Sequence, residues 1–393
     1  MRIRKERVQR CPVRLVADLL VTVGGSVPGD PSGLGEFMVT EALPVDVDGL
    51  TPEWVTRALN DRHPGVRVAG VEVLWQHAST NHHAQLGLTY DEQRGAPDTL
   101  FCKMASLDPQ HRAAIGATGM GAREARFYRD LAPSLQMRMP TCYFAAADDD
   151  GAFLLLLEDL RSTGCTVSDG TWGVSSELAK GALADLAALH VHFEDEALLS
   201  DIRPWISANP PGASGFTQHM LRQVVDTHRD ILSEAYVAVA EMYIADPVTV
   251  DALWHSGRQT VIHGDPHICN VFFDGPRVGF LDWGLLAVST PMRDVTYFLT
   301  VAMDPEDRRQ AERELLQHYI DVRSSLGGTP FSFDEAWQAY RMHAGYGVLA
   351  SFLSLVPPYN SEDQLAFSEA FRGRATAALD DLDTVEAMRQ RLS

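Results

Sequence analysis

Lysine is scarce in this chain, which has 393 residues and 33 Lys plus Arg but lysine only at positions 5, 103 and 180. Long apolar runs are missing too: no stretch approaches the roughly 18 consecutive apolar residues of a membrane span, so a membrane-spanning protein is not expected. Cysteines are few and scattered, without a CxxC pair, at positions 11, 102, 142, 165 and 269. This spacing favours neither a disulfide framework nor a zinc site, and it predicts a reduced, cytoplasmic protein.

Basic charge is in short supply as well. The formal net charge is −20 at pH 7, which argues against nucleic acid or an anionic membrane as a partner. Two phosphate-binding glycine motifs do not occur in the sequence, the Walker A pattern and Gly-x-Gly-x-x-Gly. The absence of the first excludes a P-loop enzyme.

Length and apolar content suit two domains of ordinary size. With 45% hydrophobic residues, a chain this long can fill two cores. We expect a strand-rich first domain over residues 38–159 and a mainly helical second domain over residues 160–393. Residues 1–37 combine a basic start with a Gly/Pro/Ser/Asp segment, typical either of a disordered extension or of a start assigned too early. A secretion signal is not expected there, because Asp18 interrupts the apolar stretch.

The most informative segment is residues 260–284, TVIHGDPHICNVFFDGPRVGFLDWG. It contains Asp265 in an HGD triplet, then Asn270, then Asp282. The residues between Asn270 and Asp282 form two short apolar runs on either side of an Asp-Gly-Pro turn, which predicts a β-hairpin. That hairpin would bring Asp282 back beside Asn270, so that two oxygen ligands converge on one site.

This layout is the one that phosphoryl transfer from a metal nucleotide requires. Asp265 would accept or orient the proton of an attacking hydroxyl group. Asn270 and Asp282 would supply hard oxygen ligands of the kind that suits Mg²⁺. The spacing therefore predicts an enzyme that transfers the γ-phosphate of ATP, or of GTP, to a hydroxyl group of a small molecule.

The same block resembles the HGDxxxxN…DW motif of the aminoglycoside phosphotransferase family. The following stretch, Pro291–Leu299, is similar to the ecdysteroid-kinase-like and choline-kinase-like branches. The resemblance runs in order from about Val71 to Met342, with its sharpest motifs in the centre. It implies an α+β, two-lobed, protein-kinase-like fold, with a small antiparallel sheet in the first lobe and a larger, mainly helical second lobe.

The resemblance also implies roles for individual residues. Asp265 would be the catalytic base, and His263 would orient the backbone of its loop. Asn270 and Asp282 would be the metal ligands. Asp294, in the similar stretch that follows, would be a buried brace for the catalytic loop.

A kinase of this kind also needs a lysine on a strand and a glutamate on the next helix. Lys103 lies in a short strand-like run, residues 99–104. In a chain this rich in arginine, lysine there suggests that a compact ammonium group is needed. Glu124 falls on a predicted helix with Phe127 and Leu131 four apart on one face. The resemblance implies that Lys103 binds the α- and β-phosphates and that Glu124 holds it; the alternative is a strand-edge lysine and a solvated glutamate.

The nucleotide-binding loop is harder to assign, because the turn between the first two predicted strands has no glycine. Hydroxyl, amide and backbone donors could replace a glycine loop there, or the same residues could be ordinary turn residues. The residues concerned are Ser79, Thr80 and Asn81. Further on, the leucine-rich run from Phe153 predicts a buried strand that enters a linker at Glu158 and Leu160. In a two-lobed kinase this linker is the hinge, where backbone groups receive the adenine.

The acceptor is the least determined partner. Residues 333–355 form a long amphipathic stretch. Aromatic residues occur at helical spacing within residues 334–359, and such residues are more often core than ligand-binding. If some of them line the cleft, an apolar alcohol, steroid-like or macrolide-like, is favoured over a polycationic aminoglycoside. The aromatic residues are Trp337, Tyr340, Tyr346 and Phe352.

Two other classes of protein stay open. A metal-dependent hydrolase could use His263 and His267 with His190 and His192, although HExxH does not occur. A pseudokinase would bind nucleotide and regulate without chemistry, and the glycine-free loop supports it. The oligomeric state is not indicated.

Overall fold

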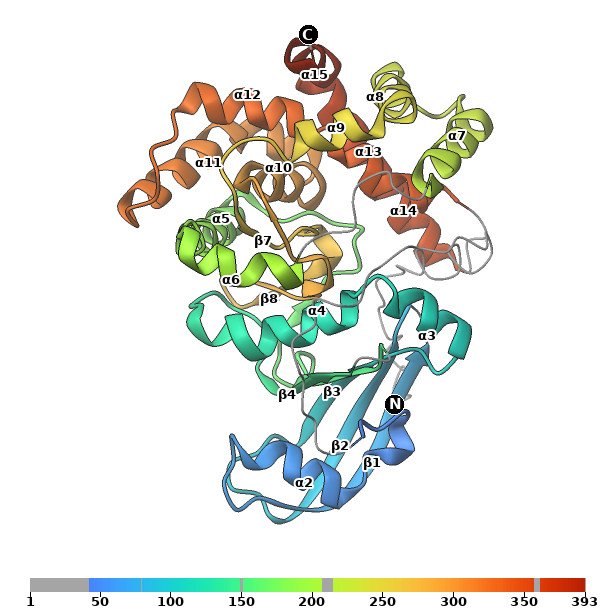
Figure 1. The fold of residues 1–393 in the computed structure, drawn as a ribbon, viewed down its shortest axis with the longest axis vertical. Coiled ribbons are helices and arrows are strands. Elements are labelled where there is room, and N and C mark those ends of the chain that lie inside the picture. Colours follow the sequence, from blue (N-terminus) through green and yellow to red (C-terminus); the bar gives the residue numbers. More distant parts are fainter. Residues whose placement is uncertain (1–41, 79, 149–150, 207–214, 357–360, 393) are drawn as a thin grey trace, which may run out of the picture.

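The computed structural model describes residues 42–78, 80–148, 151–206, 215–356 and 361–392. The expected extension over residues 1–37 lies outside these ranges. The chain folds into a strand-rich lobe at one end and a larger helical lobe at the other (Figure 1). The α+β, two-lobed architecture expected from the sequence is confirmed.

The small lobe is built on a five-stranded antiparallel sheet. Successive side chains of a strand point to opposite faces of a sheet. Leu86, Leu100 and Leu156 are buried on the face that packs against helix α2 (Pro52–Asn60), while Lys103 lies on the opposite face. In spatial order the strands are β1 (Arg67–Ala78), β2 (His82–Glu92), β3 (Thr99–Met104), β5 (Phe153–Glu158) and β4 (Cys142–Ala147).

Between β3 and β4 the chain forms α3 (Pro109–Gly116) and α4 (Met120–Arg126). The helix expected around Glu124 is present, but it ends earlier than the sequence suggested. Phe127–Leu131 forms a turn of π-helix, followed by the 3₁₀ turn Ala132–Ser134. Phe127 and Leu131 remain buried, so the apolar face was predicted correctly and the wider helical turn was not.

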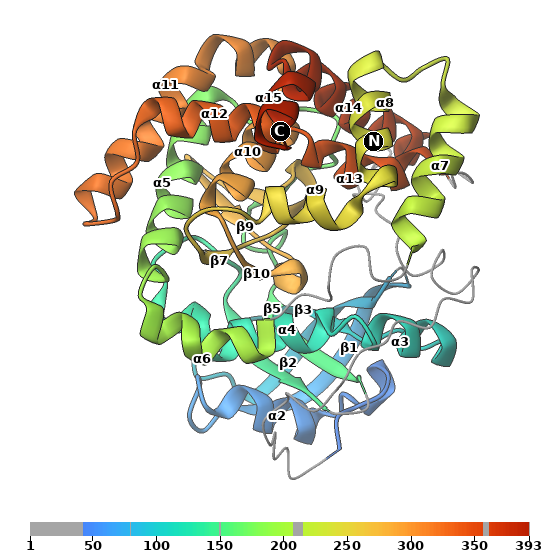
Figure 2. The ribbon, with the colours of Figure 1, turned by 45° about the horizontal axis from the view of Figure 1, so that its top comes forward.

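The large lobe is mainly helical, and α5 stands close to the strands of residues 260–284 (Figure 2). Its helices are α5 (Ser176–His192), α6 (Glu196–Ile206), α7 (Phe216–His228), α8 (Glu234–Ala245), α9 (Pro247–Trp254), α10 (Pro291–Ala302), α11 (Pro305–Ser325), α12 (Phe333–His343), α13 (Tyr346–Ser351), α14 (Glu362–Asp381) and α15 (Thr384–Leu392). Short 3₁₀ turns cover Val47–Gly49, Ile268–Asn270, Trp283–Leu285 and Phe352–Leu355.

The predicted hairpin is present in the large lobe. Strand β8 (Val271–Asp274) pairs with β9 (Arg277–Phe280), and β6 (Thr166–Val167) joins them. A second small sheet pairs β7 (Thr260–Ile262) with β10 (Ala287–Ser289). These two sheets carry the whole of the segment that the sequence singled out.

The prediction of a long helical stretch over residues 333–355 has to be corrected. The stretch does not form one long helix but breaks into α12, α13 and a 3₁₀ turn. The break falls at Gly345, a residue that favours helices poorly. A Cβ atom there would lie 2.6 Å from the Met388 Sδ and 3.3 Å from Trp254, so the glycine permits a close approach that a side chain would block.

One apolar core continues from the small lobe into the large lobe. At their junction the ring of Phe127 stacks on Trp283, with 3.9 Å between centroids and 12° between planes. The helix α4 and the turn after β9 are thus packed against each other. Within the described residues, no helix is both long enough and apolar enough to cross a membrane.

Candidate functional site

Lys103 links the two lobes. Its ammonium nitrogen lies 2.6 Å from Glu124 Oε2 on α4 and 3.0 Å from Asp282 Oδ1 after β9. The Lys103 side chain is 7% exposed and that of Glu124 is 2% exposed, whereas that of Asp282 is 44% exposed. The geometry therefore brings Lys103 and Glu124 together, and it adds an ion pair with Asp282 that the sequence did not suggest.

The charges of this trio are not balanced, because one buried ammonium faces two carboxylates. Burial raises the pKa of Glu124 to about 7, although Lys103 opposes the shift. Burial alone would lower the pKa of Lys103, but Asp282 and Glu124 raise it above its ordinary value. Lys103 also holds the pKa of Asp282 below its ordinary value, against the effect of burial. Asp282 is therefore ionised at neutral pH, and the surplus negative charge would suit a cation.

Helix α4 is fastened directly to the turn that carries Asp282. The guanidinium of Arg123 donates to the carbonyl oxygen of Gly284 at 2.7 Å. Asp282 itself has a left-handed backbone, with φ of 63°. Non-glycine residues adopt this conformation at a cost and often at functional sites.

Asp265 and Asn270 face each other on the loop between β7 and β8. The side-chain amide of Asn270 donates to the backbone carbonyl of Asp265 at 2.9 Å and to its Oδ2 at 3.0 Å. The backbone amide of Leu281 donates to the carbonyl of Asn270 at 3.0 Å. This bond sets the residue next to Asp282 against Asn270, as the hairpin predicted.

Asp294 lies under the loop at the start of α10, completely buried. Its carboxylate accepts the backbone amides of His263 at 2.6 Å and Gly264 at 2.9 Å, and it lies 3.3 Å from His190 Nε2. Burial would raise the pKa of Asp294, but His190 and the backbone donors hold it below its ordinary value. Gly264 has φ of +86°, and a Cβ atom there would lie 2.0 Å from the carbonyl oxygen of Leu285. The loop conformation thus requires both the glycine and the carboxylate.

His263 is fully buried and both of its ring nitrogens have partners. Its Nδ1 accepts the backbone amide of Asp265 at 3.2 Å, and its Nε2 donates to the carbonyl of Leu281 at 3.1 Å. Burial lowers its pKa, so the ring is neutral at pH 7. Its position fits the orienting role that the resemblance implied, which stays a prediction.

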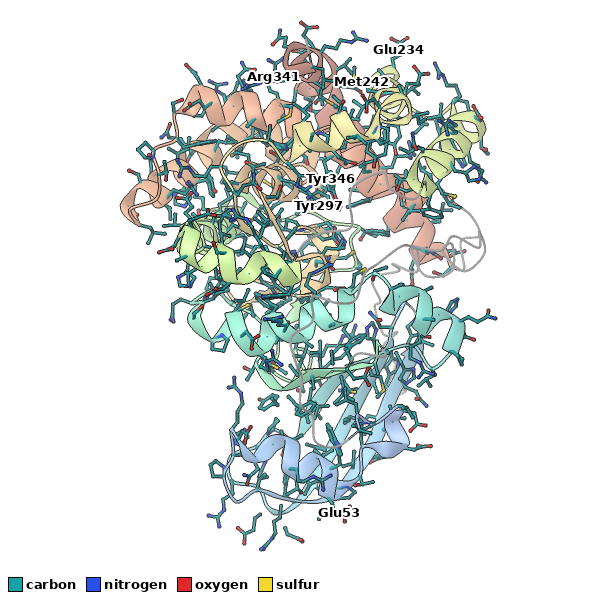
Figure 3. The ribbon with its side chains drawn as sticks, in the orientation of Figure 1. Glu53, Glu234, Met242, Tyr297, Arg341 and Tyr346 are labelled. Carbon is teal, nitrogen blue, oxygen red and sulfur yellow. The ribbon has the colours of Figure 1, made fainter. Side chains whose placement is uncertain are left out.

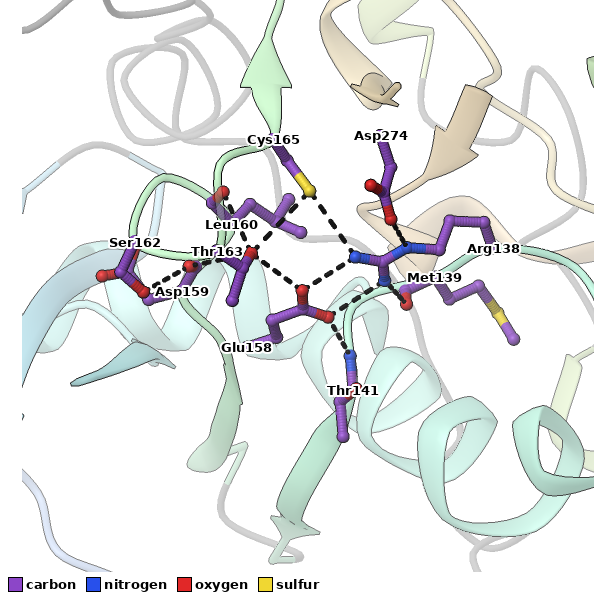
Figure 4. Close-up of polar contacts among 10 residues, drawn as sticks. All are labelled: Arg138, Met139, Thr141, Glu158, Asp159, Leu160, Ser162, Thr163, Cys165 and Asp274. Carbon is purple, nitrogen blue, oxygen red and sulfur yellow. Dashed lines mark hydrogen bonds and ion pairs between the residues drawn. The ribbon is translucent and has the colours of Figure 1, made fainter. Parts of the chain in front are cut away.

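Two segments were predicted to bind the nucleotide, the turn at residues 79–81 and the hinge at Glu158 and Leu160. Ser79 lies outside the described residues, and Thr80 and Asn81 connect β1 to β2, with Asn81 9% exposed. At the expected hinge, the Glu158 carboxylate is bound by Arg138 and by other protein donors (Figure 4). The carbonyl oxygen of Leu160 accepts the backbone amide of Cys165 at 2.8 Å. These groups are therefore already engaged within the protein.

Arg138 was missed by the sequence reasoning. Its guanidinium makes two bonds to Glu158, at 2.9 and 2.7 Å, and a third to Asp274 at 2.7 Å (Figure 4). It also lies over the ring of Phe272, 4.9 Å from the centroid. The end of β5 is thus tied to the hairpin that carries the predicted metal ligands.

The sheet face beside Lys103 carries aromatic rings. His83 is the direct partner of Lys103 in the β2–β3 register, and its ring lies 5.5 Å from that of Phe101. Burial and the charge of Lys103 lower the pKa of His83 to about 3. A neutral imidazole and a phenyl ring thus lie on the same face of the sheet as Lys103.

On the other side of Asp265 lie Tyr297 and Tyr346, which are neighbours in Figure 3. The Tyr297 hydroxyl donates to Asp265 Oδ1 at 2.8 Å, and its ring meets that of Tyr346 edge-on at 5.5 Å. Tyr346 is the one member of the predicted aromatic set that the described contacts bring to this place. The others are elsewhere: Trp337 packs on Phe333, Tyr340 donates to Glu312, and Phe352 lies in a separate core.

The oxygen atoms present fit a magnesium ion better than a zinc ion. Asp282 offers a half-exposed, ionised carboxylate, and the Asn270 amide group uses its nitrogen as a donor, which leaves its oxygen as an acceptor. In the part of the chain that the structure describes, no group of three or more His, Cys, Asp or Glu side chains could hold a metal. His190, proposed for a hydrolase, is bound to Asp294 and to the Tyr319 hydroxyl at 2.8 Å.

The chain has the protein-kinase-like fold. Its features are the small antiparallel sheet, the helical lobe and the pair formed by Lys103 and Glu124. The chain belongs to the ecdysteroid kinase-like family, whose model matches residues 77–323. The predicted likeness to this branch is thereby confirmed. A search of curated protein sequences returned no match.

Several solved structures are similar to this chain. A Ralstonia eutropha protein assigned as an aminoglycoside phosphotransferase has 15% identity and a TM-score of 0.49, over 84% of this chain and 98% of its own. Macrolide 2'-phosphotransferase MphH from Brachybacterium faecium has 18% identity and a TM-score of 0.42, over 84% and 97%. Choline kinase LicA from Streptococcus pneumoniae has 13% identity and a TM-score of 0.45, over 84% and 98%.

Proposed function

We propose that this protein is a kinase of a small molecule, which transfers the γ-phosphate of a nucleoside triphosphate to a hydroxyl group. The observation that carries the proposal is the contact between the lobes. Lys103 lies 2.6 Å from Glu124 and 3.0 Å from Asp282, and Asp282 follows the hairpin that begins at Asn270. On this proposal Lys103 would be the phosphate-binding cation, Asn270 and Asp282 would be the metal ligands, and Asp265 would be the base. This is the set of groups that phosphoryl transfer needs.

On the nucleotide side, Lys103 would bind the α- and β-phosphates, with Glu124 holding its ammonium group in place. Asn270 and Asp282 would hold Mg²⁺, which neutralises charge on the phosphates when bound. Since Asp282 now shares Lys103 with Glu124, the arrival of the cation and the nucleotide would redistribute these contacts. ATP is the proposed donor, and GTP is the alternative.

On the acceptor side, Asp265 would take the hydroxyl proton as the oxygen attacks the γ-phosphorus. Its carboxylate is 22% exposed, which leaves one side open to a substrate. His263 and Asp294 would act on the loop backbone, through their bonds to Asp265, His263 and Gly264. Positioning supplies most of the rate in this class of reaction, so a rigid loop is the main contribution of the protein.

The proposed acceptor is an apolar alcohol rather than a polycation. The rings next to Asp265 belong to Tyr297 and His267, with Tyr346 beside Tyr297 and Phe371 5.5 Å from His267. Rings of this kind favour contact with an apolar skeleton. Neither nucleic acid nor a membrane is proposed as a partner.

Mass spectrometry of an acceptor panel tests the proposal. The protein is incubated with Mg-ATP and steroid alcohols, macrolides, aminoglycosides, choline and sugars, and Asp265→Asn is the matched control. A gain of one phosphate on one compound, absent with Asp265→Asn, is the expected result. Failure to bind nucleotide at all would refute the proposal, and phosphorylation of aminoglycosides in preference to the alcohols would refute the acceptor class.

A further inference from the structure

The carboxylate of Asp265 is held on both oxygens by donors from different elements. Its Oδ2 receives the Asn270 amide at 3.0 Å and lies 3.4 Å from His267 Nε2. Its Oδ1 receives the hydroxyl of Tyr297 at 2.8 Å. Asn270 and His267 belong to the same loop as Asp265, whereas Tyr297 belongs to α10. Tyr297 therefore holds the carboxylate from outside the loop.

The His267 ring carries its proton on the nitrogen that is nearer to Asp265. Its Nδ1 accepts the backbone amide of Cys269 at 3.1 Å. A neutral ring that accepts at Nδ1 carries its proton on Nε2. Nε2 therefore carries the hydrogen, and at 3.4 Å it makes an electrostatic contact with Asp265 Oδ2, while Asn270 is the hydrogen-bond donor to that oxygen.

Tyr297 itself is fixed by its surroundings. It is 4% exposed, and its ring lies between those of His267, at 6.3 Å, and Tyr346, at 5.5 Å. The Tyr346 hydroxyl in turn accepts a bond of 2.6 Å from Arg293, which shares the helix of Tyr297. Burial raises the pKa of Tyr297 well above its ordinary value, so its hydroxyl remains a donor at neutral pH.

Two hydrogen bonds do not exhaust a carboxylate, which has about four acceptor positions. Rotation of the Asp265 carboxylate would break the Tyr297 bond on one oxygen and the Asn270 bond on the other. Acceptor positions thus stay available, in directions that the two hydrogen bonds determine. Without the Tyr297 hydroxyl, one oxygen would lose its partner and the carboxylate could turn.

We propose that Tyr297 is a positioning residue, which fixes the orientation of the Asp265 carboxylate toward the hydroxyl group of the acceptor. The inference rests on the proposed function, because it assigns Tyr297 to the same reaction. The inference goes beyond the proposed function, because it assigns part of the reaction rate to a side chain outside the loop and the hairpin. Asp294 and Tyr297 are one helical turn apart on α10, so this helix would hold both the backbone of the loop and its carboxylate.

The test is Tyr297→Phe, which removes one hydroxyl and keeps the ring. Tyr340→Phe is the matched control, since Tyr340 is also buried and donates to a carboxylate, that of Glu312, at 3.0 Å. With the acceptor found in the panel, we expect Tyr297→Phe to lower kcat about tenfold. This estimate follows from the sensitivity of rates to small misplacements. The KM for Mg-ATP should change less than twofold, and Tyr340→Phe should leave both constants unchanged.

A double-mutant cycle separates positioning from a general structural role. If Tyr297 acts through Asp265, Tyr297→Phe should change the residual rate of Asp265→Asn less than twofold. An equal loss in both backgrounds would overturn the inference. A fall in thermal stability larger than that of Tyr340→Phe, with KM and kcat affected alike, would also overturn it.

A spectroscopic measurement tests the contact without any acceptor. In protein labelled with ¹³C at the aspartate carboxyl carbons, the Asp265 signal is the one missing from Asp265→Asn. We expect Tyr297→Phe to shift this signal and Tyr340→Phe to leave it in place; equal spectra would overturn the inference. A shifted signal in a protein that phosphorylates nothing would support the contact and count against the proposed function alone.

Discussion

The substitution Asp294→Asn examines how the loop between β7 and β8 is held. The carboxylate accepts two backbone amides, from His263 at 2.6 Å and from Gly264 at 2.9 Å, in a fully buried place. An asparagine has the same shape but keeps one acceptor oxygen. Its side-chain NH2 would face a backbone N–H. Both groups are donors, so the backbone N–H would be left without an acceptor.

The expected cost follows from these contacts. A hydrogen bond to a charged group contributes about 1.5–3 kcal/mol, and a buried donor without a partner costs about 1–3 kcal/mol. We therefore expect Asp294→Asn to lower the free energy of unfolding by about 3 kcal/mol. For a lobe of roughly 230 residues, this corresponds to a fall in Tm of about 6 °C.

Thermal unfolding at pH 7 measures the effect, with Asp251→Asn as control. Asp251 is also buried, but its carboxylate accepts from a side chain, the Tyr243 hydroxyl at 3.0 Å. An asparagine can accept that bond, so the control should lose less than about 1 kcal/mol. Equal losses for the two variants would refute the idea that the backbone donors make Asp294 necessary.

Three further predictions concern the two lobes and their junction. Lys103→Met should weaken Mg-ATP binding more than tenfold in calorimetry, while Lys180→Met, on the surface of α5, should not. Because its folded pKa is raised from 4.5 to about 7, Glu124 should make the nucleotide-free protein lose stability, on the order of 3 kcal/mol, as pH rises from 4.5 to 7; unfolding curves of Glu124→Gln should lack this trend. Arg138→Lys, which loses the two-pronged bond to Glu158, should cost about 2 kcal/mol in urea unfolding, and an unchanged midpoint would contradict this.

The sequence was most informative where contacts are local. Asp265, Asn270 and Asp282 lie within one loop and one hairpin, and the turn residues between them determine how the hairpin closes. Lys103 was marked by its strand and by the scarcity of lysine, whereas the role of Glu124 was recognised only through the family resemblance. Which of these residues act in catalysis stays a prediction.

Contacts that depend on tertiary packing were missed. Tyr297 meets Asp265 across 32 positions and Arg138 meets Asp274 across 136, and no local pattern marks either pair. Tyr297 could have been noticed through its spacing of three residues from Asp294 on one helix. A helical period cannot tell which aromatic residue faces a cleft, and this is why Tyr346 was not separated from Trp337 or Phe352.

The central claim is that one cleft binds Mg-nucleotide and transfers its phosphate by way of Asp265. The most direct measurement follows ³²P from [γ-³²P]ATP to an organic acceptor, with wild type and Asp265→Asn compared at the same occupancy of Mg-ATP. The account predicts labelled acceptor with wild type, and at least a hundredfold less with Asp265→Asn although nucleotide binding is retained. Equal transfer by the two proteins would contradict it, and so would the failure of both proteins to bind Mg-ATP.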